Sequence, residues 1–254
     1  MALSLRQIAL VARERDPLVA DICAVLGTTV CCVDDAVQAF GLENAVMPVG
    51  TQFLEVVAPV RRDAPAARYL DRRGGDAGYM VICQAGSASE QQACRDRAAA
   101  LGIRIAWERR HADGCYLQLH PRDTGGCFFE IDAVNGDDPG GTWPPAGGVV
   151  DGTGTRAGAI TAVGIAAREP ETLCARWRAI AGVDAAVAIG GQLELPLTNA
   201  TIRFTHSDDE RSEGLTALTL RCSDREAILA TAAARSLIDK NAALTLGEVR
   251  ITLE

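Results

Sequence analysis

The sequence predicts an α+β protein of two domains, built from repeated βαβββ modules whose strands form mixed sheets. Three observations carry this prediction. Short apolar strand-like segments alternate with amphipathic helices, the two halves of the chain begin alike, and a segment rich in Gly, Pro and Asp separates them. A shared strand–helix opening in both halves indicates duplication of one structural unit.

The first half opens with an apolar strand that ends in Ala-Arg-Glu and leads into a helix at Pro17–Leu26. Gly27 closes this helix, as C-terminal capping prefers. A second strand at Gly78–Gln84 leads into a second helix at Ser89–Leu101. The other strands of this half are predicted at Thr28–Val33, Leu42–Val49, Thr51–Val57, Ile103–Arg109, Cys115–His120 and Cys127–Ile131.

The second half repeats the pattern in fewer residues. Its first strand, Ala159–Ala167, is also followed by Arg-Glu, and its helix at Glu171–Ala181 is closed by Gly182. A strand at Leu215–Arg221 and a helix at Arg225–Leu237 open the last unit. The remaining strands are predicted at Ala185–Ile189, Gln192–Leu197, Thr201–Thr205, Ala242–Leu246 and Glu248–Leu253, so the chain holds four βαβββ units.

The segment 135–156 lacks helix or strand periodicity and is predicted to be a linker. It divides the chain into a first domain at 1–134 and a second at 157–254. Trp143 and the two prolines beside it indicate that the linker packs onto a surface.

Composition excludes several classes of function. The 254 residues carry a formal charge of −8, and the basic residues are scattered, which argues against nucleic acid as a partner. No apolar run approaches a membrane span, and the first residues lack a signal-peptide layout, so we expect a cytoplasmic protein without a membrane partner. Nine cysteines without any Cys-x-x-Cys pair are expected to be reduced and mostly buried.

Strand alternation places a few polar side chains among apolar ones on one face of the first-half strands. If these strands curl into an open half-barrel, that face lines its concavity. A lone Glu55 or Glu130 is costly when buried and unpaired, and two convergent carboxylates need a cation, a shared proton or an arginine. The alternative is that each glutamate points to solvent from an edge strand. The predicted inward series are Gln7/Ala9/Val11, Phe53/Glu55/Val57, Tyr79/Val81/Cys83 and Phe128/Glu130/Asp132.

Three stretches, Phe40–Ala45, Phe53–Pro59 and His120–Ile131, resemble the glyoxalase/bleomycin resistance/dioxygenase superfamily, also called vicinal oxygen chelate. The resemblance covers most of residues 5–133, and the His-Pro-basic-x-x-Gly-Gly run followed by Glu is its most specific part. The fold it implies is paired βαβββ modules that close U-shaped mixed-sheet half-barrels around a cleft. The second half is similar only in its pattern of units and is expected to be a degenerate copy.

The resemblance implies four cleft positions that hold a metal ion in many members. They fall on Gln7, Glu55, Tyr79 and Glu130. Tyr79 stands where the family has histidine, and neutral tyrosine is a poor ligand for zinc, nickel or iron. The oxygen set of Gln7, Glu55 and Glu130 suits magnesium, manganese or calcium. The alternative is a metal-free pocket, in which Tyr79 donates a hydrogen bond to one carboxylate and the carboxylate pair binds a substrate hydroxyl or amine.

The same resemblance implies a small-molecule ligand and leaves a homodimer open. We expect a lyase or isomerase acting on a small oxygenated metabolite, with Glu55, Glu130 and Tyr79 as the catalytic residues. A non-catalytic binding or sequestering protein of the resistance type is the alternative, and a vestigial pocket on an interaction module is the third. The apolar residues predicted to contact the ligand are Phe53, Val57 and Phe128.

Several polar residues have two interpretations each. His120 either contacts substrate at the cleft mouth or is a turn residue that leads to Gly125-Gly126. In the second half, Arg203 takes one of the four positions, with Ala162, Thr216 and Thr252 at the others. Arg203 either anchors an anionic ligand or belongs to a structural lid. The pairs Arg61-Arg62 and Arg72-Arg73 are either solvated surface or select a carboxylate-bearing substrate.

Overall fold

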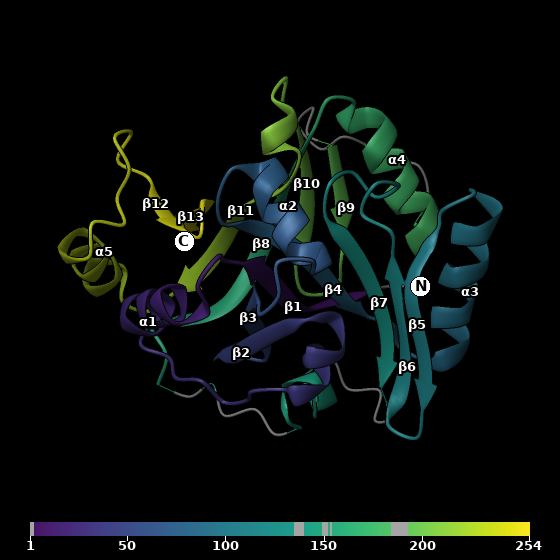
Figure 1. The fold of residues 1–254 in the computed structure, drawn as a ribbon, viewed down its shortest axis with the longest axis horizontal. Coiled ribbons are helices and arrows are strands. Elements are labelled where there is room, and N and C mark those ends of the chain that lie inside the picture. The colour runs from purple at the N-terminus through teal and green to yellow at the C-terminus, as the bar shows by residue number, and fades with distance from the viewer. Residues whose placement is uncertain (1–2, 135–139, 149–151, 153, 184–192) are drawn as a thin grey trace.

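The computed structural model describes residues 3–134, 140–148, 152, 154–183 and 193–254. Their strands form two mixed sheets, one of seven strands and one of six (Figure 1). All strands of the first sheet come from residues 4–134, and all strands of the second come from residues 157–253. The predicted α+β class with two mixed-sheet halves is confirmed.

The first sheet has the strand order β2-β3-β1-β4-β7-β6-β5. Helices α1 and α3 follow β1 and β4 along the chain, while the shorter helix α2 lies between β3 and β4 in sequence. The elements are β1 (Ser4–Val11), α1 (Arg15–Leu26), η1 (Asp35–Phe40), β2 (Leu42–Val49), β3 (Gln52–Pro59), α2 (Pro65–Arg73), β4 (Ala77–Gln84), α3 (Ala88–Ala100), β5 (Ile105–His111), β6 (Gly114–Leu119) and β7 (Phe128–Val134).

The second sheet has the order β12-β13-β11-β8-β10-β9. A short 3-10 helix, η2 (Pro144–Ala146), precedes it in the chain. Its elements are β8 (Ala157–Ala167), α4 (Pro170–Ala181), β9 (Leu193–Pro196), β10 (Thr201–His206), η4 (Glu210–Ser212), β11 (Gly214–Cys222), α5 (Arg225–Ala234), β12 (Leu244–Leu246) and β13 (Val249–Leu253).

The two sheets share one pairing scheme. In the first, β1 pairs parallel with β3 and antiparallel with β4, and β4 pairs parallel with β7. In the second, β8 pairs parallel with β10 and antiparallel with β11, and β11 pairs parallel with β13. The predicted capping glycines close α1 and α4 in left-handed conformation, with φ of 64° at Gly27 and 71° at Gly182. This repetition agrees with the duplication inferred from the sequence.

One large hydrophobic core joins the two halves. Helix α1 lies beside α5, and α3 lies beside α4 (Figure 1). At the centre, the ring of Trp177 on α4 stacks on Phe129 of β7 with centroids 4.1 Å apart. The Trp177 indole N–H also donates to the carbonyl oxygen of Thr124 at 3.1 Å. A second, smaller core lies on the other face of the first sheet and includes residues of α2 and Trp143.

The first sheet differs from the prediction in three places. Residues 28–33 form no strand; only Cys32 pairs, in a single bridge with Val46, because Asp34 turns the chain by accepting a hydrogen bond from the Ala36 N–H at 2.8 Å. The 3-10 helix η1 and helix α2 were not predicted, although proline at the start of α2 is a typical helix signal. Unit one therefore has two described strands after its helix where three were predicted.

The second half differs from the prediction mainly in where its elements end. The strand predicted at 185–189 lies outside the described residues. Helix α5 ends at Ala234 and not at Leu237, and two described strands follow it. Across both halves, only the second unit shows three described strands after its helix.

All nine cysteines lie in the described ranges as free thiols, four of them buried. Cys31 is exposed, so the expectation of mostly buried thiols holds only in part. Among the described helices, none combines the length and the apolarity that crossing a membrane requires.

Candidate ligand-binding and catalytic pocket

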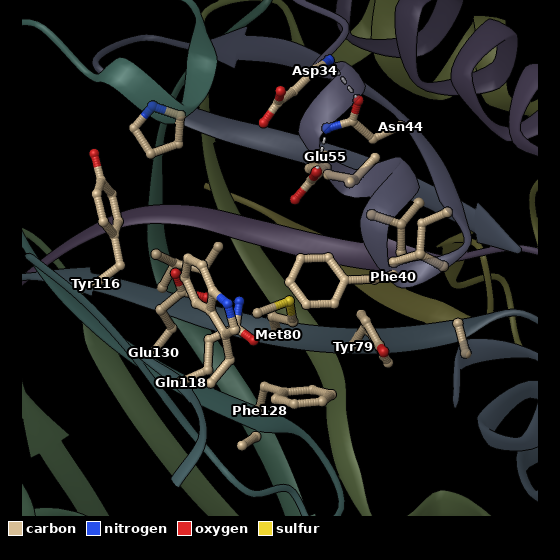
Figure 2. A pocket seen from close by; sticks show the side chains of 18 of the residues that line it. Asp34, Phe40, Asn44, Glu55, Tyr79, Met80, Tyr116, Gln118, Phe128 and Glu130 are labelled. Carbon is tan, nitrogen blue, oxygen red and sulfur yellow. Dashed lines mark hydrogen bonds between the residues drawn. The ribbon is translucent and has the colours of Figure 1, made fainter. Parts of the chain in front are cut away.

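A hollow of about 1300 Å³ lies against the first sheet on the face away from the large core. Its wall combines residues of all seven strands of this sheet with η1, α2 and the turn at 120–122. Figure 2 shows Glu55 and Glu130 facing this hollow from different strands. The sheet curvature thus brings together two carboxyls that are 75 positions apart in the sequence.

Glu55 on β3 is held by two side-chain amides. Its Oε2 accepts a hydrogen bond from Gln7 Nε2 at 2.8 Å, and its Oε1 accepts from Asn44 Nδ2 at 2.7 Å. Asn44 is itself fixed, because its Oδ1 accepts from the backbone N–H of Asp34 at 2.8 Å (Figure 2). Burial raises the pKa of Glu55, while these two amide donors act in the opposite direction.

Trp143 determines how Gln7 is oriented. The indole N–H of Trp143 donates to Gln7 Oε1 at 2.8 Å, and an indole can only donate. The carbonyl of Gln7 therefore turns toward Trp143 and its NH₂ group turns toward Glu55. A β-bulge at Arg6 in β1 places Arg6 beside Gln7, with its guanidinium 5.0 Å from the centre of the Trp143 ring.

Glu130 on β7 has different neighbours. Burial raises the pKa of Glu130 to about 7, although hydrogen bonding from Asp132 and Gln118 opposes this rise. Asp132 lies two residues further along the same strand face and is fully buried. Burial and then the charge of Glu130 raise the pKa of Asp132 well above its usual range. The two carboxyls therefore titrate as one coupled pair, of which Glu130 is the member that lines the pocket.

Aromatic rings form another part of the wall. Tyr79 makes edge contacts with Tyr69 and Phe128, with ring centroids 5.2 and 5.1 Å away. Burial raises the pKa of Tyr79 to about 12, so its hydroxyl is neutral at physiological pH. Within the described chain, Tyr79 donates no hydrogen bond to Glu55 or Glu130, unlike the metal-free arrangement expected above. The donors to Glu55 are the amides of Gln7 and Asn44.

The donor set does not fit a divalent cation at Gln7, Glu55 and Glu130. A metal beside Glu55 would need the carbonyl oxygen of Gln7, but that oxygen turns toward Trp143 and the NH₂ group of Gln7 turns toward Glu55. The Glu55 oxygens face amide N–H groups, which repel a cation. Among the described residues, no group of three or more His, Cys, Asp or Glu side chains is placed to bind a metal ion.

Other predicted site residues fall in different places. Val57, Phe128 and His120 line the pocket, and the backbone N–H of Arg122 donates to His120 Nδ1 at 3.2 Å. Phe53 lies behind the wall, fully buried in the smaller core. Arg203 does not reach this pocket: it lies on β10 with a half-exposed side chain, and its Nε is 3.1 Å from Glu194 Oε1.

The predicted inward series on β4 also requires correction. Tyr79 faces the pocket, but Val81 and Cys83 face the large core, and Met80 and Ile82 take their places in the wall. The cause is a register shift between β1 and β4 after Ala9, which puts Tyr79 and Met80 on the same side. Strict alternation cannot anticipate such an irregularity.

Sequence reasoning missed the residues that set the state of the two glutamates. Asn44 stands inside one of the stretches that carry the family resemblance, and Trp143 was noted only as a packing residue. Gln118 alternates with apolar residues on β6, so strand periodicity alone would have placed it on the same face as Tyr116. No local signal links any of them to a particular glutamate.

No protein-family model matches the sequence, and no curated protein sequence matches it. Among solved structures, the chain is similar to a mutant of 4-hydroxymandelate synthase from Streptomyces coelicolor. The TM-score is 0.66 at 15% identity, over 93% of this chain and 76% of that one. This likeness concerns the fold of both halves together.

Shorter likenesses cover about half of the chain. A methylmalonyl-CoA epimerase variant from Streptomyces coelicolor, in complex with 2-nitronate-propionyl-CoA, matches 54% of this chain and 99% of its own, with 17% identity and a TM-score of 0.46. The epimerase from Mycobacterium tuberculosis matches 53% of this chain and 89% of its own, with 20% identity and a TM-score of 0.44.

Proposed function

Because this chain has the fold of the glyoxalase/bleomycin resistance/dioxygenase superfamily, we propose that it is an isomerase or lyase acting on a small oxygenated metabolite without a metal ion. The observation that carries the proposal is Glu130, a buried carboxyl in the pocket wall whose pKa lies near neutrality. A general base works best when its pKa is close to the working pH.

The two glutamates have separate roles in this proposal. Each oxygen of Glu55 accepts one amide hydrogen bond and keeps a second acceptor position, which a substrate hydroxyl or amine can use. Glu130 takes a proton from a carbon next to a carbonyl, and the C–H electron pair moves toward the carbonyl oxygen. When the electron pair returns, the same carbon can take a proton on its opposite face, which gives an epimer. If the next carbon instead loses a leaving group with its bonding electron pair, the result is an elimination.

The aromatic wall supports a second candidate, a protein that binds a small molecule without transforming it. Tyr79, Phe128 and Phe40 offer ring faces and edges to a ligand, and the buried carboxyls beside them favour an amine or hydroxyl group. In this case Glu130 accepts a hydrogen bond from the ligand and transfers no proton.

Hydrogen exchange with solvent separates the two candidates. A library of small carbonyl metabolites is incubated with the protein in D₂O, and deuterium at carbon is measured by mass spectrometry. We expect exchange or turnover of at least one compound, a loss of 100-fold or more in Glu130→Gln, and no change after dialysis against EDTA. Glu108→Gln, an exposed glutamate outside the pocket, is the matched control.

Two results would contradict the enzyme proposal. If a compound raises the melting temperature but shows neither exchange nor turnover, the binding function stands in its place. If Glu130→Gln retains full exchange, Glu130 is not the base.

A further inference from the structure

A second hollow of about 560 Å³ adjoins the pocket. The two share part of their walls, namely Tyr69, Arg72, Pro121 and Arg122. The smaller hollow lies where the two halves meet, because α2 and the turn at 121–126 contribute from the first half and Arg168, Arg211 and Glu213 from the second. We call it the arginine hollow.

Its charge is opposite to that of the protein as a whole. The wall carries five arginines and one glutamate, whereas the full chain has a net charge of −8. The described ion pairs connect none of Arg72, Arg73, Arg122 and Arg211 to a carboxylate. Guanidinium groups that are gathered in this way repel one another unless an anion lies between them.

Glu213, the one acidic residue among those that line the hollow, accepts hydrogen bonds from two of the arginines. Glu213 Oε1 accepts a hydrogen bond from the backbone N–H of Arg168 at 3.3 Å, and the Glu213 carbonyl accepts from Arg73 Nη1. Glu213 therefore helps to position two of the arginines.

The ring of Tyr69 contacts two of the guanidinium groups. The guanidinium carbons of Arg72 and Arg73 lie 5.7 and 5.9 Å from the centre of its ring. Tyr69 is buried, and its hydroxyl donates to the carbonyl oxygen of Gly78 at 2.7 Å, so the ring cannot swing away. Arginines whose positions are fixed before binding lose less entropy when they contact a phosphate or carboxylate.

We propose that the arginine hollow binds a dianionic oxyanion group, a phosphate monoester or pyrophosphate. Guanidinium groups recognise such groups through paired N–H donors, and several arginines match more than one negative charge. Because the hollow adjoins the main pocket and shares Arg72 and Arg122 with it, a ligand that spans both would place its phosphate here and its reacting part near Glu130. The anion site itself does not depend on the proposed chemistry at Glu130.

Calorimetric titration with inorganic pyrophosphate at several fixed salt concentrations tests this, with acetate at the same ionic strength as the singly charged comparison. We expect saturable binding of pyrophosphate that weakens as salt rises, and much weaker binding of acetate. Arg122→Ala and Arg211→Ala should each weaken the affinity roughly 5-fold. Glu213→Gln keeps the oxygen that faces Arg168, removes the negative charge and should strengthen binding about 2- to 3-fold.

Arg221→Ala is the matched control, because Arg221 is exposed and lines neither hollow. The proposal is overturned if pyrophosphate binds no more tightly than acetate, or if Arg122→Ala and Arg211→Ala bind it as the control does. Glu130→Gln should bind pyrophosphate like the unmodified protein. Loss of the chemistry at Glu130 and loss of the anion site can therefore be told apart.

Discussion

Glu55 and Glu130 are equally buried, each 6% exposed, but their side chains have different hydrogen-bond partners. Two amide N–H donors hold the oxygens of Glu55, and hydrogen bonds to the charged form favour ionisation. Asp132 and Gln118 are the partners of Glu130, and burial raises its pKa to about 7 against their effect. Burial raises the pKa of both carboxyls, and their hydrogen-bond partners oppose this rise.

The raised pKa of Glu130 predicts that the stability of the protein depends on pH. The pKa of Glu130 is about 7 in the folded protein, above its value in the unfolded chain. The stabilisation is therefore complete at low pH and is lost as pH rises toward about 7, because the unfolded chain releases the proton first. We expect the free energy of unfolding to fall by a few kcal/mol between pH 5 and pH 8.

Urea denaturation at both pH values measures this change. Glu130→Gln should flatten the dependence, since an amide does not titrate. Glu108→Gln should leave the pH dependence unchanged. Arg95 lowers the pKa of that exposed glutamate, so Glu108 does not titrate between pH 5 and pH 8. An equal pH dependence in Glu130→Gln and the unmodified protein would contradict the assignment.

At the level of elements, the contact of β4 with β11 depends on a glycine. A Cβ atom at Gly78 would lie 2.4 Å from both the Cγ and the carbonyl oxygen of Leu215. The two central strands of the two sheets therefore approach each other at a residue without a side chain. The same glycine accepts the Tyr69 hydrogen bond, so it also supports the wall shared by both hollows.

Gly78→Ala should destabilise the protein by about 1–3 kcal/mol, because backbone and a buried leucine cannot both move aside. Gly75→Ala is the matched comparison, since a Cβ there meets nothing within 4 Å. We expect this second variant to change the free energy of unfolding by less than about 0.5 kcal/mol. Thermal unfolding monitored by circular dichroism measures the change in stability for each variant. Equal effects of the two substitutions would mean that the strand contact is not tight.

For the whole molecule, the two halves share a core in spite of their separate sheets. Trp177 from the second half fills space against Phe129 from the first, and its indole N–H bonds to Thr124. The proposed division into domains at 1–134 and 157–254 therefore describes topology. The packing predicts that the halves unfold together.

Trp177→Ala tests this cooperativity. Removing this side chain should cost about 3–5 kcal/mol, and both halves should still lose structure in one transition at a lower temperature. Differential calorimetry and far-UV circular dichroism should give coincident midpoints for the variant, as for the unmodified protein. Two separated transitions in either protein would show that the halves fold independently.

Local pattern predicted most of the architecture, although it placed a strand at 28–33 that does not form and missed η1 and α2. The strand–helix repeats, the glycines that close α1 and α4, and the segment between the halves all follow from short-range preferences, which the tertiary structure did not override. The sequence also predicted that Glu55 and Glu130 lie on strands with an apolar, inward-facing side. It failed at Val81 and Cys83, where one register shift reverses the faces of β4.

The sequence by itself determined the fold class and identified Glu55 and Glu130 as candidate site residues. Only the tertiary structure decided what those carboxyls can do. Trp143 orients Gln7 from 136 positions away, Asp132 and Gln118 set the state of Glu130, and arginines from both halves meet beside the pocket. Such contacts cannot be predicted from local sequence, because most of them join residues that are far apart in the chain and meet only after folding. The sequence pattern indicates only which face of each element is apolar.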